Sequence, residues 1–516
     1  MGNQESAMYK QESAEYESCE RWRIRGNQAF KDGDVSKAEN LYTEGIECCV
    51  EPLLLCYSNR AVALTSLRRM REAINDFAVA LALDPSYLIA KLRAATCYLL
   101  LGEVQEAMQY YKSCMESRMG VCLDRRIAIE AADGLQKAEK VAESLHRSAE
   151  LLKQKTCDAA SRALEIIADA LSISSYSEKL LEMKGESLCK LQKYDEAIKL
   201  CEQTLDFAEK NFALHDTKNT NDSVRLWRWR IMSKSYYHLG KLKAALDLIK
   251  KQEQVIFVND GSGNESQKSL IPLGTTIREL LAHRKAGNKA FQSGKFAEAL
   301  DHYNAAISKS VESQPFAAIC FCNRAAAHQG LGQIIDAIAD CSVAMALDEN
   351  YAKAASRRAT LHEMIRDYVD AVTDLKRLIS LLENEAQEKA GSFSEVLRKA
   401  RQRLSSVEEK AKSQIPLDLY LILEIKSSDP GSVIKKAYKK AALKHHPDKV
   451  VQLLARSVRL NDGRLQKDIS EKVKKDADSL FKMIGEAYDV LSNTAKRKEY
   501  NYEEEIRQSQ TGEEFA

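Results

Sequence analysis

One pattern recurs along most of this chain and limits its fold more than any other feature. Each copy has a glycine or another small residue in a first helix, then a turn, then a second helix that opens on an alanine. The opening alanines are Ala38, Ala73, Ala107, Ala163, Ala197, Ala245, Ala299, Ala337 and Ala371. Several of them are 34 residues apart, and most positions seven residues beyond them are small as well. Small residues on one helix face let neighbouring helices approach closely, so we predict an all-α solenoid of stacked helix pairs.

The composition agrees with a folded helical protein. The 516 residues include only 7 prolines. Hydrophobic residues make up 45% of the chain and charged residues 29%, a balance that excludes a wholly disordered chain. The net charge of +2 gives no reason to expect nucleic acid as the main partner. The 13 cysteines contain no CxxC pair, which predicts reduced thiols and no zinc site. No apolar run is long enough to span a membrane, and we expect neither a metal nor another cofactor.

Longer gaps between the alanines divide the array into three groups of three, about nine repeats in all. The predicted segments are a flexible leader over 1–18, repeat groups over 19–120, 140–257 and 277–383, a loop over 258–276 and a helical linker over 384–416. The residues from Met1 fit the pattern for N-myristoylation at Gly2, but no basic cluster follows closely to strengthen a single acyl chain. We therefore expect a cytoplasmic protein, with nuclear entry and modification of Gly2 left open.

The period and the Gly/aromatic/Ala pattern resemble the tetratricopeptide repeat (TPR), in which the first helices of successive repeats line a concave groove. In the third group, five polar side chains fall on such first helices. They are Arg284, Asn288, Asn323, Lys353 and Arg357. Two spacings of four residues put Arg284 with Asn288, and Lys353 with Arg357, on one helix face each. Cations and amides that converge in this way suit an acidic peptide with a free carboxylate at its end.

These five positions resemble the carboxylate clamp of TPR co-chaperones, although Arg284 stands where lysine is usual. The resemblance implies that the groove binds the acidic C-terminal tails of heat-shock proteins 70 and 90. The alternative is that the five residues form an ordinary solvated face. The first group has a related but degenerate set, namely Arg23, Asn27, Asn59 and Arg93, with Ile89 at the place that matches Lys353. We expect weak or altered tail binding there, and no clamp in the middle group.

A different module follows Pro416. We expect a helix from about Gly431 to His445 that ends at His446-Pro447-Asp448, because proline disfavours helix in the residue before it. Its predicted inner face is Ile434, Ala437, Tyr438, Ala441 and Leu443, and its outer face is Lys435, Lys436, Lys439, Lys440 and Lys444. A second helix is predicted from Ala477, Phe481, Ile484, Ala487, Tyr488 and Leu491 at helical spacing. Together these features predict a helical hairpin with an exposed tip.

Residues 417–502 resemble the J domain of the DnaJ family, with an insertion over about 451–475 and a tail over 503–516. No Gly/Phe-rich linker or cysteine-rich zinc module is present, which is typical of the class defined by the J domain alone. The resemblance implies that His446, Pro447 and Asp448 provoke ATP hydrolysis in a heat-shock protein 70 partner. It implies that the lysine face steers this encounter. The insertion adjoins the triad, where it can tune or obstruct docking of the partner.

The combined prediction is a non-enzymatic co-chaperone that holds heat-shock protein 70 or 90 by the tail and stimulates heat-shock protein 70. Such a protein assists folding or client transfer, and meets unfolded clients indirectly. One alternative is a TPR scaffold whose J domain is inactive. A metalloenzyme that uses His445, His446 and Asp448 as ligands is disfavoured, because a proline interrupts them and no further ligand cluster is present.

Overall fold

The structure, a computed structural model, describes residues 20–47, 54–116, 122–154, 156–212, 218–258, 270–310, 312–388, 394–457 and 463–513. Within these ranges the secondary structure consists of helices without strands, which confirms the predicted all-α class. The predicted leader and much of the predicted loop at 258–276 lie outside the described residues. The chain divides into two compact units. The first is Met1–Ser235 with Asp247–Gly263, and the second is Tyr236–Leu246 with Asn264–Ala516.

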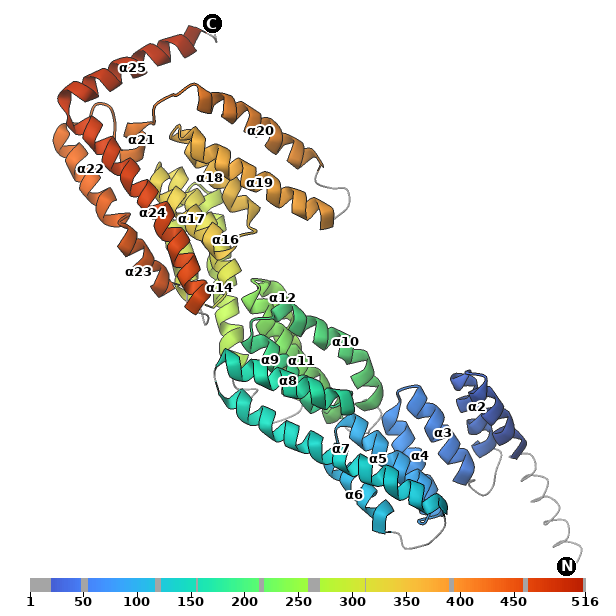
Figure 1. Cartoon of the computed structure of the whole chain (residues 1–516). Helices are drawn as coiled ribbons and strands as arrows, with labels where there is room; N and C mark the ends of the chain where they lie inside the picture. The colour runs from blue at the N-terminus through green and yellow to red at the C-terminus, as the bar shows by residue number, and fades with distance from the viewer. Residues whose placement is uncertain are drawn as a thin grey trace, which may run out of the picture. The chain divides into compact units, whose positions relative to one another are not determined.

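The first unit is an array of helices that pack in chain order (Figure 1). After a helix over 20–31 come α2 (Val35–Glu47), α3 (Leu54–Ser66), α4 (Met70–Leu83), α5 (Leu88–Leu101), α6 (Val104–Glu116), α7 (Cys122–Lys153), α8 (Cys157–Ile173), α9 (Glu178–Lys190), α10 (Tyr194–Phe212), α11 (Lys218–His238) and α12 (Leu242–Val258). Helix α7 contacts both α6 and α8, and so continues the stack between the first and middle groups. The boundary between the units falls within α11 and α12.

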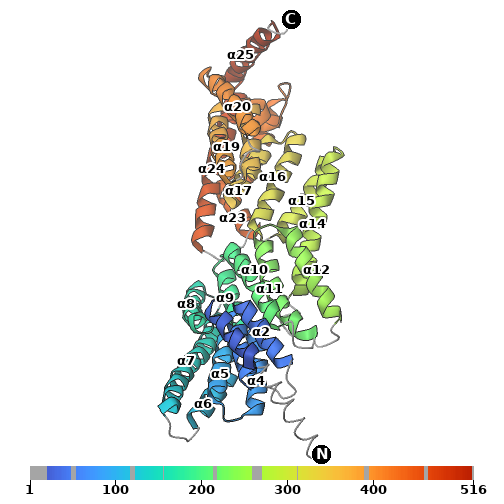
Figure 2. The same ribbon diagram turned by 90° about the vertical axis from the view of Figure 1, so that its right-hand side faces the viewer.

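The second unit carries the third repeat group and the C-terminal module. Its repeat helices are α14 (Leu270–Gln292), α15 (Phe296–Lys309), α16 (Gln314–Gly330), α17 (Ile334–Leu347), α18 (Ala352–Met364) and α19 (Tyr368–Glu388). Helix α20 (Ser394–Lys412) packs on α19 and occupies the segment that we predicted as a helical linker. Figure 2 shows these helices side by side, in the order of the chain.

The small residues of the repeat form its interior. All nine opening alanines, from Ala38 to Ala371, are completely buried. In the first and third groups, a tyrosine ring of the next helix fills the space beside a glycine of the first helix. A Cβ atom on Gly26 would lie 2.5 Å from the ring of Tyr42, and one on Gly287 would lie 2.7 Å from the ring of Tyr303. The predicted close approach of helices is therefore confirmed.

An Arg–Asp ion pair ties the two helices of several repeats together. Arg60 binds Asp76 at 2.7 Å in the first group. In the third group, Arg324 binds Asp340 at 2.6 Å and Arg358 binds Asp374 at 2.6 Å. Each aspartate is nearly or fully buried. These pairs were not predicted, although their constant spacing of 16 residues is present in the sequence.

The C-terminal module consists of α21 (Leu419–Leu423), α22 (Gly431–Lys444), α23 (Pro447–Ser457), α24 (Gly463–Ser492) and α25 (Thr494–Glu513). Helices α22 and α24 form the predicted hairpin, in which the rings of Tyr438 and Tyr488 stack at 4.1 Å. Ile434, Ile484 and most other predicted core residues are buried or partly buried. Leu443 is an exception, because 63% of it is exposed, so its assignment to the inner face was wrong.

The predicted insertion is largely helical in its described part. Helix α23 starts at Pro447, where proline suits the first turn because it lacks only an N–H that would be unpaired there. Helix α24 begins at Gly463 and so lengthens the second arm of the hairpin by several turns. The predicted tail is also partly helical, since α25 runs through it to Glu513.

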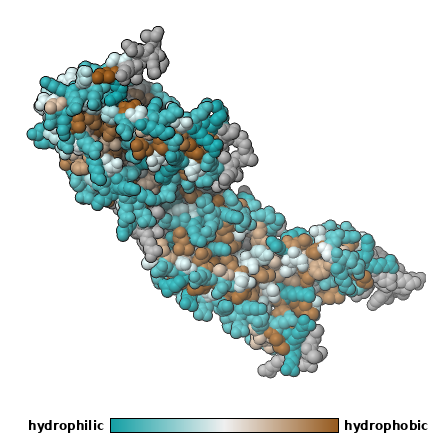
Figure 3. Space-filling view, turned by 45° about the horizontal axis from the view of Figure 1, so that its top comes forward, coloured by the Kyte–Doolittle hydropathy of each residue, from teal (hydrophilic) through white to brown (hydrophobic). Residues whose placement is uncertain are grey.

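No helix in the described ranges combines the length and the apolar character that crossing a membrane requires. In Figure 3 hydrophilic residues cover most of the visible face, and hydrophobic residues gather in smaller patches.

Candidate functional site

The five predicted clamp residues of the third group lie on three successive first helices. Arg284 and Asn288 are on α14, Asn323 is on α16, and Lys353 and Arg357 are on α18. Asn288 receives two hydrogen bonds at its Oδ1. The hydroxyl of Tyr303 donates at 2.8 Å and the amide of Asn323 donates at 3.4 Å. These bonds fix the orientation of the Asn288 amide, which leaves its NH₂ group directed away from Tyr303 and available to a ligand.

The cations of this set are less constrained. The guanidinium of Arg284 lies 5.4 Å from the ring centre of Phe316. Lys353 is exposed, and within the described ranges the structure does not join it to the other four residues by a hydrogen bond or an ion pair. The structure therefore brings the two asparagines together, with the cations of the set on two of these three helices, α14 and α18.

Arg357 carries a buried donor that the fold leaves unpaired. Its Nε is buried and has no hydrogen-bond partner in the described part of the chain. Burial raises the pKa of the neighbouring Tyr303 phenol to about 12, and the charge of Arg357 acts in the opposite direction. A buried donor without a partner costs about 1–3 kcal/mol. The guanidinium therefore keeps a positive charge without a protein acceptor at Nε, which favours an anionic group beside Arg357.

The first group repeats the asparagine arrangement but not the free cations. Asn27 Oδ1 accepts from Tyr42 at 2.8 Å and from Asn59 at 3.0 Å, as Asn288 does in the third group. Arg23 is already paired, because its Nε donates to Glu20 on the same helix at 2.7 Å. This hydrogen bond is the largest influence on the raised pKa of Arg23.

Ile89, which replaces the lysine of the clamp, lines a cavity of about 670 Å³ in the first unit. Arg93 lines the same cavity, together with apolar residues of α5 and charged residues of α7. The predicted degenerate clamp is therefore a groove with one cation paired internally and another replaced by an apolar side chain.

The predicted triad lies at the junction of α22 and α23. His446 and Asp448 are exposed, with 48% and 67% of their side chains accessible, whereas Pro447 is buried. The ring of His446 meets the ring of Phe481 edge to face at 5.5 Å. Lys474 of α24 lies 3.7 Å from the carboxylate of Asp448. The two polar side chains of the triad are thus presented to solvent on a rigid helical corner.

The predicted lysine face has two parts. Lys435, Lys436, Lys439 and Lys440 are exposed on α22. Lys444, at the end next to the triad, forms an ion pair with Asp336 of α17. The adjacent His445 is buried, and its Nε2 lies 2.8 Å from the other oxygen of Asp336. The cationic face therefore ends in a contact with the third repeat group.

Asp336 is the residue that sequence reasoning missed most clearly. Its burial alone would raise its pKa, but the hydrogen bonds from His445 and Lys444 outweigh burial and hold the pKa well below its ordinary value. Further contacts join the two modules beside it. Arg358 donates to Asp476 of α24 at 2.6 Å, Arg366 donates to Glu504 of α25 at 2.6 Å, and the N–H of Asp418 donates to the carbonyl of Ile365 at 3.0 Å.

Apolar residues of both modules share one hydrophobic core within the second unit. From the repeat group it includes Ile334, Ile335, Ile338, Leu361 and Ile365, and from the C-terminal module Leu419, Ile422, Leu423, Leu480 and Met483. Figure 1 shows α24 alongside α17, and the two helices are in contact. A sequence signal for this contact was the high apolar content of α17, which only Asp336, Asp340 and Ser342 interrupt.

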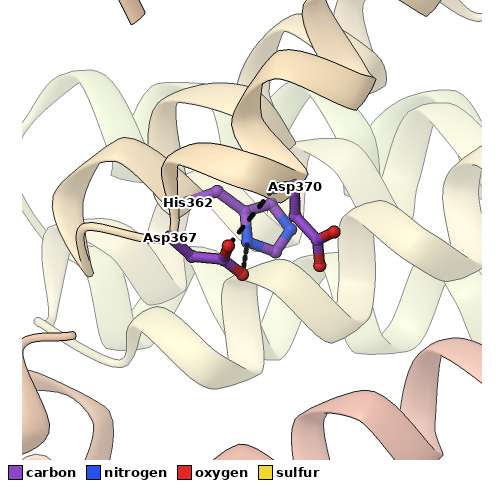
Figure 4. Close-up of side chains that lie close together, drawn as sticks. All are labelled: His362, Asp367 and Asp370. Carbon is purple, nitrogen blue, oxygen red and sulfur yellow. Dashed lines mark hydrogen bonds and ion pairs between the residues drawn. The ribbon is translucent and has the colours of Figure 1, made fainter. Parts of the chain in front are cut away.

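His362, Asp367 and Asp370 lie close enough to offer a metal ion three ligand atoms within 4.8 Å of one another (Figure 4). The fold itself uses these groups, because His362 Nδ1 lies 3.1 Å from Asp367, and Asp367 accepts from the N–H of Asp370 at 3.2 Å. A similar bond joins His328 to Gln333 at 2.7 Å in the preceding repeat. We interpret the cluster as a repeated link across the turn between two helices.

Comparison with known proteins agrees with both modules. The DnaJ domain family matches residues 418–455, and a tetratricopeptide repeat family matches residues 90–117. The chain is 27% identical to "DnaJ homolog subfamily C member 7" of Mus musculus over 97% of this chain and 89% of that protein. It is also 27% identical to the "DnaJ homolog subfamily C member 7 homolog" of Dictyostelium discoideum, over 94% of this chain and 79% of that protein.

Among solved structures, the TPR domain of P58(IPK) matches 77% of this chain and 100% of its own length, with a TM-score of 0.57 and 14% identity. This likeness supports the repeat fold alone. The sequence matches and the helical architecture together show the two kinds of module that the chain contains. An array of tetratricopeptide repeats is followed by a DnaJ domain (J domain).

Proposed function

We propose that this protein is a co-chaperone that binds the acidic tail of a heat-shock protein 70 or 90 in the groove of its third repeat group. Its J domain then stimulates ATP hydrolysis by heat-shock protein 70. The combination of TPR repeats with a J domain, shared with full-length relatives, supports the co-chaperone class. The protein performs no catalysis itself, and the ATP is hydrolysed by the partner.

The observation that supports the clamp is that Arg357, whose Nε has no partner among the described residues, shares successive first helices with the oriented amides of Asn288 and Asn323. A peptide carboxylate could accept from Arg357 and Lys353, and the NH₂ groups of Asn288 and Asn323 can donate to its other oxygens. Hydrogen bonds to charged groups contribute about 1.5–3 kcal/mol each. An acidic tail is therefore favoured over a neutral one.

The observation that carries the J domain is the exposure of His446 and Asp448 beside a lysine face. This arrangement presents a positive helix and a polar tip to a negatively charged partner. The test is the steady-state ATPase rate of a heat-shock protein 70 with the wild-type chain and with His446→Gln. We expect stimulation by wild type only, and equal rates would contradict the assignment.

The clamp is tested separately by titrating a peptide that ends in Glu-Glu-Val-Asp with a free carboxylate. We expect Lys353→Ala to weaken binding by about tenfold or more, which corresponds to the loss of one charge-assisted contact. Lys376→Ala, a change at an exposed lysine on α19, is the matched control. Unchanged affinity of Lys353→Ala would remove the third group as a tail-binding site.

The second candidate is a TPR scaffold with an inactive J domain. The specific observation in its favour is the contact of Lys444 and His445 with Asp336, which withdraws part of the cationic face. Stimulation that depends on His446 would exclude this candidate.

A further inference from the structure

The contact between the third repeat group and the J domain has the composition of a specific interface. At its centre a single carboxylate, Asp336, meets both Lys444 and His445. At one margin Arg358 bonds Asp476, and Lys472 pairs with Glu349. The centre and one margin of the contact thus pair opposite charges, which sets the register of α24 on the repeat helices.

A comparison of repeats inside the chain shows that α17 is adapted to this contact. Helix α4 of the first group has the same place in its group, and the two align with an offset of 264 residues. Where α4 has Arg71 and exposed Asn75, α17 has Ile335 and Ala339. Ile335 is 2% exposed and belongs to the core shared with the J domain. A polar outer face has been replaced by an apolar one at the docking position.

The shared core continues beyond this contact into the hairpin of the J domain. Ile434 and Ile484 are fully buried between α22 and α24, and Tyr438 stacks on Tyr488 within the hairpin. The rim pair at Lys472 and Glu349 is more than half exposed on both sides, so salt screens it. The hairpin therefore has the means to remain folded when it leaves the repeat group.

Docking engages the part of the lysine face that lies nearest to the triad, although half of the Lys444 side chain stays exposed. Lys444 and His445 directly precede His446, and both are engaged by Asp336. Lys440 lines a small cavity of about 90 Å³ with Asp336 and Glu424, so it also faces carboxylates of this chain. An acidic surface that approached this end of α22 would compete with Asp336 for the same cations.

We propose that the third repeat group is an internal docking partner of the J domain, and that Asp336 withholds the triad end of the cationic face from an acidic chaperone. The inference rests on the proposed function, because it concerns how strongly the J domain acts on heat-shock protein 70. Docked and released forms are in equilibrium, and the chaperone binds the released form. Its apparent affinity is lowered by the fraction of chains that are docked.

The test is a double variant, Ile335→Arg with Ala339→Asn. It gives α17 a polar outer face like that of α4, so the repeat is expected to fold. Arg71 of α4 pairs with Glu103, and the position that matches Glu103 in the third group is Asp367. The matched control is Val369→Arg, which adds an arginine at a side chain of the same group that is 69% exposed.

Docking is measured without reference to activity by carbodiimide cross-linking, which joins Lys472 to Glu349 only when they are paired. We expect the cross-link in wild type and in Val369→Arg, and its loss in the double variant. Persistence of the cross-link in the double variant would overturn the docking face that we assign.

Activity is measured as heat-shock protein 70 ATPase against concentration of the full chain. We expect the double variant to reach half-maximal stimulation at roughly a tenth of the wild-type concentration. This factor corresponds to a wild-type protein in which about one-tenth of the chains have a released J domain before the chaperone binds. The inhibitory role would be overturned if the double variant lost the cross-link but stimulated the ATPase no better than wild type, provided that this stimulation still depended on His446. Absence of any His446-dependent stimulation in either protein would instead refute the proposed function.

Discussion

The first and third repeat groups share one interior and differ on both of their faces. In both, an asparagine pair is oriented by a tyrosine, and an Arg–Asp pair joins the helices. In the groove, the third group has Lys353 where the first has Ile89. The difference shows that the small residues and ion pairs specify the scaffold, while the exposed positions specify what it binds.

The outer faces differ as strongly as the grooves. Val79 of α4 is 37% exposed, whereas Val343 at the matching position of α17 is 7% exposed. Leu83 and Leu347 show the same contrast, at 42% and 6%. Equivalent helix positions are therefore partly exposed in the first group and buried in the third, whose helix α17 also contacts α21 and α24 of the J domain.

The largest expected effect concerns the Arg–Asp ion pair, which the first and third groups share. Asp340→Ala and Asp76→Ala each leave a mostly buried arginine without its carboxylate, which costs about 3–5 kcal/mol of local stability. Hydrogen exchange resolved along the chain measures the two losses separately. Asp301→Ala, at an exposed side chain, is the control and should change stability by about 0.5 kcal/mol or less. A small loss of local stability in either group would contradict the inference that this ion pair stabilises the scaffold of both groups.

The second prediction concerns substitutions that give the first repeat group the free cations of the third. Ile89→Lys with Glu20→Gln restores the missing cation and frees Arg23 from its partner. In a background with Lys353→Ala, binding of the Glu-Glu-Val-Asp peptide should tighten by about tenfold or more, as expected for one added charge-assisted contact.

Isothermal titration of the full chain measures this gain. Ile89→Leu with Glu20→Gln is the control, since it changes the shape of the groove without adding a charge. If both variants bind the peptide alike, the cation at this position does not explain the difference between the grooves.

The third prediction concerns the outer faces. Val343→Ala removes buried methyl groups and should lower stability by about 1–2 kcal/mol. Val79→Ala shortens a partly exposed side chain and should change the stability by about 0.5 kcal/mol or less. The midpoints of denaturant unfolding test this contrast, and equal losses would show that burial by the J domain adds nothing at this position.

The smallest effect is expected from pH. The groups around Asp336 are Lys444, His445, Glu424, His328 and Arg324. The pKa of Asp336 in the folded chain lies below its ordinary value of 3.8, so its ionised form stabilises the docked state. This contribution is complete above that ordinary value and is lost as the pH falls toward the lower, folded pKa. Energy transfer between labels on α19 and α25 should therefore stay constant from about pH 7 to pH 5 and fall only in stronger acid.

The constant energy transfer that we expect between about pH 7 and pH 5 also tests the role of the Asp336 carboxylate. A large loss of energy transfer between about pH 7 and pH 5 would mean that histidine protonation, rather than Asp336, controls docking.

Local periodicity was sufficient to predict the repeats and the hairpin. Each alanine signal depends on residues within two helical turns, and the nine positions that it marked are all buried. The docking contact could not be predicted in this way, because Asp336 and His445 are 109 residues apart. The exposure of Leu443 was missed for a related reason, since a hydrophobic residue at helical spacing does not reveal which face is covered.

Helix α24 has 30 residues and is therefore about 45 Å long. In its first half Lys472 and Asp476 bond the repeat group, and further on Ile484 and Leu491 pack within the hairpin. One residue added between Asp476 and Ile484 would rotate these two sets by about 100°, and seven would restore the angle but separate them by about 10 Å more. Changes in length are consequently compatible with this arrangement only upstream of Lys472.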